Sequence, residues 1–242
     1  MREAKDVFEF NLKPGQMLTR YYEVVELLGS GWEGEVYLVR ERCTGIERTA
    51  KLFFPARNRG DKTAMRYAQK LNALRHCPIV IQYHNHMGIT LKSVPVTMLI
   101  SEFVEGELLS QFLARQPGHR LPAFQAVHLL HALARGMETV HTIGEYHGDL
   151  HSDNIILQRY GLSFDIKLVD MYHWGPPSRA NIKEDVMDMV KLLYESIGGQ
   201  KHYSKQPAPI KSICSGLKRT LVLKRFRSAG ELRQHLEMIQ WD

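Results

Sequence analysis

The stretch His147-Gly-Asp-Leu-His-Ser-Asp-Asn154, followed by Lys167-Leu-Val-Asp170, decides how the chain can be interpreted. Asp149 and Asn154 lie five residues apart in a polar loop, and Asp170 ends a short apolar strand. Carboxylate and amide oxygens are the ligands that Mg²⁺ prefers, and a carboxylate can also orient or deprotonate an attacking hydroxyl. We therefore expect Asn154 and Asp170 to hold a metal ion and Asp149 to act as the base in a phosphoryl transfer.

The same loop allows two other interpretations. His147, Asp149, His151 and Asp153 occupy alternate positions, which point the same way on an extended strand and could bind a transition metal. Alternatively, the loop is a polar turn whose Asp and Asn side chains cap the local backbone. The place of Asp170 favours phosphoryl transfer over both.

A glycine-rich turn lies between two predicted strands and reads Gly29-Ser-Gly31-Trp-Glu-Gly34. Glycine has no Cβ, so the backbone N–H groups of Gly29, Gly31 and Gly34 can approach a polyphosphate closely. A dinucleotide-binding motif leads instead from a strand into a helix. Val36 follows the turn and could pack on a flat base. The alternative is a flexible hairpin turn without a ligand.

Lys51 lies in the third predicted strand, in the sequence Thr49-Ala50-Lys51, some fifteen residues after the glycine-rich turn. Its ammonium could bind the same phosphates as a compact positive charge. The alternative is a lysine at the edge of the sheet whose ammonium reaches solvent.

The hydrophobic pattern predicts an α+β fold of two lobes. In the first hundred residues it predicts strands, with one helix at Asp61–Arg75. These strands are Tyr22–Leu28, Glu35–Arg40, Arg48–Phe53, Val80–His86 and Pro95–Phe103. Further on, helices are predicted at Leu108–Arg115, Pro122–Thr142, Lys183–Ser196 and Ala229–Ile239, and short strands at Ile155–Leu157 and Ile166–Val169. We expect a small antiparallel β-rich lobe at 1–101, a hinge at 102–107 and a larger, mainly helical lobe at 108–242.

Composition and charge limit the classes of function. The 242 residues carry a net charge of +6, with basic stretches at 57–75 and 201–233. Such stretches either attract an acidic or phosphorylated partner or are solvated faces. The three cysteines have no CxxC spacing, which is typical of a reducing cytoplasm. The longest apolar run is too short and polar to cross a membrane, and no nucleic-acid-binding motif is present.

Taken in order, these segments resemble the protein-kinase fold, in particular bacterial Ser/Thr kinases of eukaryotic type. His147–Asn154 is similar to the catalytic loop H-x-D-x-x-x-x-N of that family, and Leu99–Gly106 is similar to its hinge. Arg227 and the residues that follow it resemble the final kinase helix and the arginine before that helix. The resemblance implies that Asp149 is the base, that Asn154 and Asp170 bind Mg²⁺, and that Lys51 meets the phosphates of ATP. For the adenine it implies the backbone of Glu102 and Val104, with Val36 and Ala50 beside them and Ser101 as a small gatekeeper. It also implies that Asp185 anchors the catalytic loop.

Four departures from that family pattern bear on function. Tyr67 stands where the family has a glutamate that pairs with the lysine, and no Glu occurs between Glu47 and Glu102. Gly148 replaces the arginine of H-R-D, which argues against control by activation-loop phosphorylation. His151 replaces the catalytic-loop lysine that neutralises the γ-phosphate.

The fourth departure is the short segment after Asp170, which reads Asp170-Met-Tyr and then Trp174-Gly-Pro-Pro. Only about fifteen residues separate Asp170 from Asp185, so the usual peptide platform is abbreviated. This shortening also resembles aminoglycoside and choline phosphotransferases.

We expect a cytoplasmic, ATP- and Mg²⁺-dependent phosphotransferase that acts on Ser or Thr of a protein. A kinase of a small hydroxyl compound and a nucleotide-binding pseudokinase scaffold are the alternatives.

Overall fold

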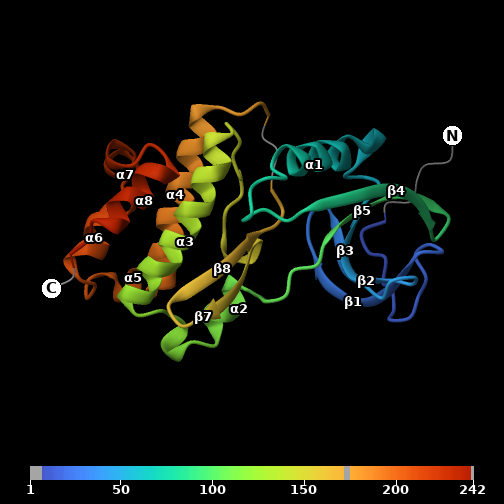
Figure 1. Cartoon of the computed structure of the whole chain (residues 1–242), viewed down its shortest axis with the longest axis horizontal. Helices are drawn as coiled ribbons and strands as arrows, with labels where there is room; N and C mark the ends of the chain where they lie inside the picture. The colour runs from blue at the N-terminus through green and yellow to red at the C-terminus, as the bar shows by residue number, and fades with distance from the viewer. Residues whose placement is uncertain (1–6, 172–174, 241–242) are drawn as a thin grey trace. The chain divides into compact units, whose positions relative to one another are not determined.

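The computed structural model describes residues 7–171 and 175–240. Tyr172 and Trp174, which belong to the short segment after Asp170, lie outside the described residues. The chain divides into two compact units, the first formed by Met1–Arg75 and Ile81–Phe103, the second by His76–Val80 and Val104–Asp242 (Figure 1). The hinge at 102–107 stays a prediction.

The first unit is built on an antiparallel sheet, which has five strands in the described part of the chain. The strands are β1 (Tyr22–Ser30), β2 (Gly34–Glu41), β3 (Glu47–Phe53), β4 (Tyr83–Leu91) and β5 (Val94–Glu102), in the order β1-β2-β3-β5-β4. The β-branched and aromatic residues of these segments suit a pleated, half-buried surface. Because this order places β3 at the centre, Lys51 is held by neighbours on both sides.

The segment before β1 covers one face of the sheet and buries a carboxylate there. Phe10 is 1% exposed and belongs to the apolar core of this face. Its N–H donates to Glu35 Oε2 at 3.1 Å, and the Tyr37 hydroxyl donates to the same oxygen. Burial and this carboxylate raise the pKa of Tyr37. Glu35 therefore joins the N-terminal segment to the sheet, a role that the sequence did not reveal.

Helix α1 (Lys62–Ala73) follows a short 3₁₀ turn, Arg59–Asp61, and packs on β4 and β5. It confirms the predicted helix. The basic stretch 57–75 does not form a single exposed face, because Lys70 is only 4% exposed and the Arg57 guanidinium stacks on the Trp32 ring.

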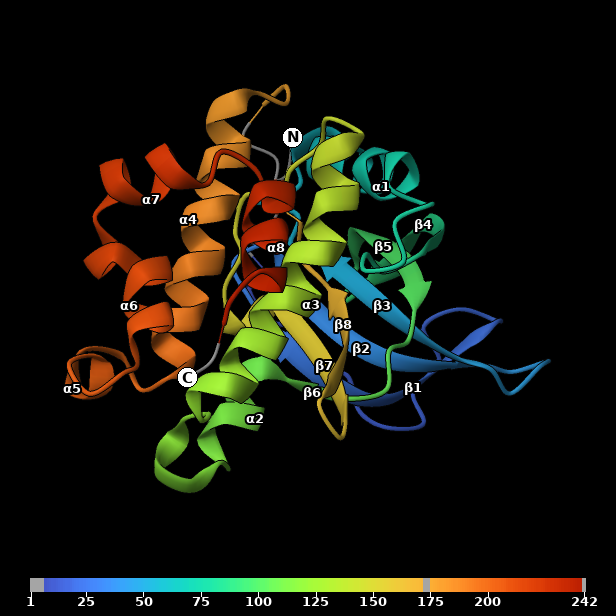
Figure 2. The ribbon, with the colours of Figure 1, turned by 60° about the vertical axis from the view of Figure 1, so that its left-hand side comes forward.

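The second unit is mainly helical (Figure 2). Its helices are α2 (Leu109–Ala114), α3 (Ala123–Thr142), α4 (Arg179–Ser196), α5 (Gly199–Tyr203), α6 (Ala208–Cys214), α7 (Arg219–Arg225) and α8 (Ala229–Glu237). Its small sheet consists of β6 (Glu107–Leu108), β7 (Ile155–Tyr160) and β8 (Ser163–Leu168), in that order. Helix α3 packs against α4, α8 and β8, so it is apolar around much of its circumference.

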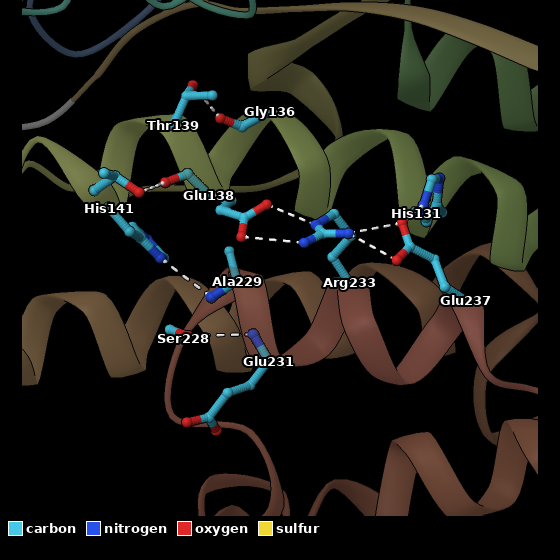
Figure 3. Close-up of polar contacts among 11 residues, drawn as sticks. His131, Gly136, Glu138, Thr139, His141, Ser228, Ala229, Glu231, Arg233 and Glu237 are labelled. Atoms are coloured by element: carbon cyan, nitrogen blue, oxygen red, sulfur yellow. Dashed lines mark hydrogen bonds and ion pairs between the residues drawn. The ribbon is translucent and has the colours of Figure 1, made fainter.

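Polar contacts along the α3–α8 interface fix the register of the two helices (Figure 3). Arg233 Nε of α8 donates to Glu138 Oε2 of α3 at 2.6 Å, and His131 Nε2 of α3 lies 3.0 Å from Glu237 Oε1 of α8. Ser228 is the N-cap residue of α8, and its hydroxyl accepts from the Glu231 N–H. The contacts of Arg233 and Glu237 with α3 tie α8 to this central helix.

The connection between α1 and β4 is part of the second unit. Leu168 N–H donates to the Ile79 carbonyl at 2.7 Å, and Val80 bridges Leu168 in parallel. Gly136 of α3 allows this close approach, because a Cβ at Gly136 would lie 2.1 Å from Ile79 Cδ1. The segment His76–Val80 therefore packs directly on α3 and β8.

Most predicted elements are confirmed, with two exceptions. The strand predicted at Val80–His86 was wrong at its start, because Ile79 and Val80 pair with β8 and β4 begins only at Tyr83. The short helices α5 to α7 were missed, since five to seven residues give little periodic signal.

The cysteines are free thiols. Cys77 and Cys214 are buried and Cys43 is exposed. Burial raises the pKa of the Cys214 thiol to about 12. Within the described residues, none of the helices has the length and apolar character needed to span a membrane.

Candidate active site

The loop that carries Asp149 is anchored by a buried carboxylate of helix α4. Asp185 on α4 is 0% exposed, and its Oδ2 and Oδ1 accept from the N–H groups of His147 at 2.7 Å and Gly148 at 2.9 Å. The His147 ring is also fully buried and bonds the Val169 carbonyl at 3.1 Å. The prediction that Asp185 anchors the loop is confirmed.

Asp185 has a third partner, which connects it to the end of the chain. The N–H of Ala229 donates to His141 Nδ1 at 3.3 Å, so we assign the ring proton to Nε2. His141 Nε2 then donates to Asp185 Oδ2 at 3.1 Å. Helix α8 thereby supports the catalytic loop through one imidazole.

The β7–β8 hairpin brings Asn154 and Asp170 to the same end of the small sheet. Val169 N–H donates to the Asn154 carbonyl at 3.0 Å, directly after the paired residues Ile155 and Leu168. Asp170, the next residue, adopts a left-handed backbone with φ 53°. Two residues far apart in sequence thus become neighbours through the hairpin register.

Asp149 and Asn154 are linked directly. The Asn154 amide nitrogen donates to the Asp149 carbonyl at 2.8 Å and lies 3.5 Å from Asp149 Oδ2. The same nitrogen lies 2.9 Å from His151 Nε2, which leaves Oδ1 of Asn154 as the atom able to bind a metal ion. One amide and two carboxylates grouped in this way fit Mg²⁺, which takes oxygen ligands.

His151 lies beside this group and is about half exposed. Its Nε2 lies 2.9 Å from the Asn154 amide nitrogen and 3.6 Å from Asp149 Oδ2, and its Nδ1 accepts from the Asp153 N–H at 3.3 Å. His151 is thus placed to orient the Asn154 amide.

The transition-metal interpretation of the loop does not agree with these contacts. Among the described residues, no group of three or more His, Cys, Asp or Glu side chains is placed to hold a metal ion. The His147 ring is engaged with the backbone on both sides, through Val169 O and the Asp149 N–H. His147 therefore supports the loop instead of binding a ligand.

Asp188 on α4 adds a carboxyl group with a raised pKa near the loop. Burial and the negative charges of Asp185, Glu184 and Asp149 raise the pKa of Asp188 to about 6, while Lys191 acts in the opposite direction. A negative charge on Asp188 is therefore unfavourable in the folded protein. The sequence offered no signal for this, because Asp188 is simply one polar position on a helix.

The glycines of the turn between β1 and β2 have different structural roles. Gly34 lies so close to β3 that an added Cβ would be 2.0 Å from the Leu52 carbonyl oxygen. At Gly29 and Gly31 an added Cβ would meet no described atom within 4 Å. Gly34 is thus needed for packing, while Gly29 and Gly31 leave the turn open to a ligand such as a polyphosphate.

Lys51 has a carboxylate partner, although none comes from α1. Its Nζ lies 2.9 Å from Glu33 Oε2, at the tip of the glycine-rich turn. Tyr67, the α1 residue at the expected glutamate position, places its ring 4.8 Å from Nζ. The sequence analysis missed Glu33, because a glutamate in a turn resembles any solvated residue.

The strand register separates the residues expected to contact the base. Lys51 pairs with Val36 of β2, whereas Ala50 pairs with Tyr37. Because successive residues of a strand point to opposite faces, Val36 and Lys51 share one face and Ala50 lies on the other. Ala50 is 0% exposed within the core cluster, which argues against the expected contact of Ala50 with a nucleotide. Thr49 shares the face of Lys51.

The segment expected to contact adenine begins at the end of β5. Ser101 is 3% exposed, and the N–H of Glu102 donates to the Gln82 carbonyl at 2.9 Å. Because the Glu102 N–H is used in this bond, the predicted backbone contact of Glu102 with adenine would be made by its carbonyl oxygen. Val104 belongs to the second unit, so its role remains a prediction.

Comparison with known families matches residues 22–191 to the model described as "Protein kinase domain". A Bacillus subtilis relative, named "Probable serine/threonine-protein kinase YbdM", is 25% identical over 98% of this chain and 94% of its own length. The Myxococcus xanthus serine/threonine-protein kinase pkn2 is 31% identical over 62% of this chain. The chain spans only 17% of pkn2 and 21% of the human dual specificity testis-specific protein kinase 1.

Among solved structures, the PknI kinase domain of Mycobacterium tuberculosis has the same fold. The TM-score is 0.67 at 20% sequence identity, over 93% of this chain and 98% of the PknI chain. The predicted two-lobed α+β fold is thus confirmed. Because the family model covers well over half of the sequence, the chain belongs to the protein kinase family and is a kinase.

Proposed function

We propose that the chain transfers the γ-phosphoryl group of ATP, in the presence of Mg²⁺, to the hydroxyl of a Ser or Thr side chain in a protein. The observation that carries this proposal is the grouping of Asp149, Asn154 and Asp170 at one end of the β7–β8 hairpin. Family membership gives the reaction class, and these three side chains supply its polar groups.

Four residues of the second unit have defined tasks in this proposal. Asp149 accepts a hydrogen bond from the acceptor hydroxyl and takes its proton as the new P–O bond forms, while the bond from the γ-phosphorus to the β–γ bridging oxygen breaks and ADP leaves. Asn154 Oδ1 and the Asp170 carboxylate hold Mg²⁺, which neutralises phosphate charge when bound. Asp185 keeps the loop rigid, so that these groups are in position before the reaction.

The first unit binds the nucleotide. The missing Cβ atoms of Gly29 and Gly31 leave room for phosphate oxygens beside the turn, and the Lys51 ammonium adds a positive charge. Val36 and Thr49 share the face of Lys51 and would contact the base, with the backbone of Glu102 and Val104.

A small hydroxyl compound is the second candidate acceptor. Helix α4 begins at Arg179, only nine positions after Asp170, which leaves little chain to build a peptide platform. Cytoplasmic location, suggested by the free cysteines, suits both candidates. An acidic partner would meet the exposed Lys201, Lys205 and Lys211, since Arg219 and Arg233 are paired internally with glutamates.

The test uses labelled ATP, Mg²⁺ and a generic basic protein substrate. We expect phosphorylation of the protein by the wild type and a loss of about 10²-fold or more in Asp149→Asn. Asp165→Asn, which changes an exposed carboxylate in the same hairpin, should behave as wild type. Turnover that needs an added small-molecule extract would favour the second candidate. ATP binding without any turnover would contradict both.

A further inference from the structure

The tip of the glycine-rich turn carries a carboxylate that reaches back to Lys51. Glu33 Oε2 and Lys51 Nζ are 2.9 Å apart, with side-chain exposures of 23% and 9%. An ion pair this sheltered from water is screened less than a surface pair. The Lys51 side chain is therefore directed by its contact with the turn.

Two aromatic rings also lie near the ammonium. The rings of Tyr67 and Phe53 lie 4.8 Å and 5.4 Å from Nζ and pack edge to face on each other. Ring faces attract a cation, but they do not fix the direction of its N–H groups as a carboxylate does. Helix α1 thus provides a ring surface for the lysine, while the turn provides a directional acceptor.

The backbone of Glu33 is itself held in place. The Phe54 N–H donates to the Glu33 carbonyl at 2.9 Å, and the Gly31 N–H closes the turn on the Gly34 carbonyl at 2.9 Å. The neighbouring Trp32 stacks under the Arg57 guanidinium. Glu33 therefore approaches Lys51 from an anchored turn.

We propose that Glu33 is the positioning residue of Lys51. This inference rests on the proposed function, because it assumes that Lys51 binds the phosphates of ATP. An ammonium has three N–H donors, so a bond to Glu33 is compatible with further bonds to phosphate oxygens. The turn that receives the phosphates thus also orients the lysine that binds them, and α1 supplies no acidic partner.

Glu33→Gln keeps the shape of the side chain and removes its charge. We expect kcat/KM for ATP to fall about tenfold or more, mainly through a higher KM, with a thermal midpoint close to that of the wild type. Glu33→Asp should recover part of the loss, because the charge remains. Glu26→Gln, an exposed glutamate of β1, is the matched control and should leave both constants unchanged.

A second variant tests whether the carboxylate can come from the helix. Tyr67→Glu, added to Glu33→Gln, places an acid beside Lys51 from α1 and should raise kcat/KM above that of Glu33→Gln alone. If this double variant does not fold, the comparison of Glu33→Gln with Glu33→Asp decides.

An unchanged or higher kcat/KM in Glu33→Gln would overturn the inference, and a higher value would mean that Glu33 competes with phosphate for the ammonium. A wild type that does not hydrolyse or transfer from ATP would instead refute the proposed function, and this inference with it. The two failures are distinguished by the activity of the wild type in the same assay.

Discussion

Gly31 and Gly34 belong to the same turn, yet substitution should affect them in different ways. Gly34→Ala places a Cβ against the Leu52 backbone, which cannot move without disturbing β3, so we expect a loss of about 2 kcal/mol or more in unfolding free energy. Gly31→Ala meets open space and should fold normally, while KM for ATP rises several-fold. Urea unfolding and titration with MgATP measure the two effects.

Equal losses of stability in the two variants would show that the turn is tightly packed throughout. Equal nucleotide affinity in wild type and Gly31→Ala would remove the turn from the phosphate-binding site.

Asp188 makes the folded state sensitive to pH. Its folded pKa of about 6 is above the ordinary value of 3.8, so between these values the folded state binds more protons than the unfolded state. Its contribution to stability therefore declines as pH rises through this window and stays unfavourable above it. Asp188→Asn should be more stable than wild type at pH 7.5, by about 1–3 kcal/mol, and the difference should vanish near pH 4.

Thermal and urea unfolding of both proteins from pH 4 to 8 checks this, with Asp165→Asn as the exposed control. A stability difference that does not change with pH would contradict the raised pKa of Asp188.

Residue-level prediction from the sequence succeeded where the partners are close along the chain. The loop 147–154 contains Asp149 and Asn154 within one turn, so their contact follows from spacing. It failed where partners come from another strand. Glu33 meets Lys51 across the β2–β3 pair, and the face of Ala50 depended on the two-residue period of a strand, which the motif match did not consider.

At the scale of elements, the contact of Gly136 with Ile79 holds the segment His76–Val80 on α3. Gly136→Ala would gain helix propensity of about 1 kcal/mol, but the new Cβ lies 2.1–2.8 Å from three Ile79 atoms. We expect a net loss of about 1–3 kcal/mol in unfolding free energy. The substitution should cost less in an Ile79→Ala background, because the closest of these atoms are then absent.

A double-mutant cycle of these two substitutions, followed by urea unfolding, measures the coupling. Additive effects would show that α3 accommodates the methyl group without touching Ile79.

At the scale of the whole molecule, the end of the chain supports the catalytic loop. Deleting residues 227–242 removes α8, and with it the Ala229–His141–Asp185 contacts and the buried Leu232 and Leu236. We expect the thermal midpoint to fall by about 10 °C or more and phosphotransfer to be lost. Deleting only residues 239–242, beyond the end of α8, should leave both unchanged.

Scanning calorimetry and the labelled-ATP assay compare the two deletions. Full activity in the longer deletion would mean that the loop is rigid without α8, although this helix lies outside the residues matched by the family model.

The overall architecture was predictable because the change from two-residue to helical periodicity is strong near Glu105. The packing of His76–Val80 with the helical unit was not, since it depends on the absent side chain of Gly136. Likewise, the order of the sheet, with β5 between β3 and β4, depends on pairing that no local pattern encodes.

The cysteines described above offer a practical use. Cys43 lies in the exposed turn between β2 and β3, whereas the other two thiols are enclosed. A maleimide dye should therefore attach at one point of the natural sequence, with no engineered substitution. Such a label on the first unit could report, by fluorescence, how that unit responds when ligands are added.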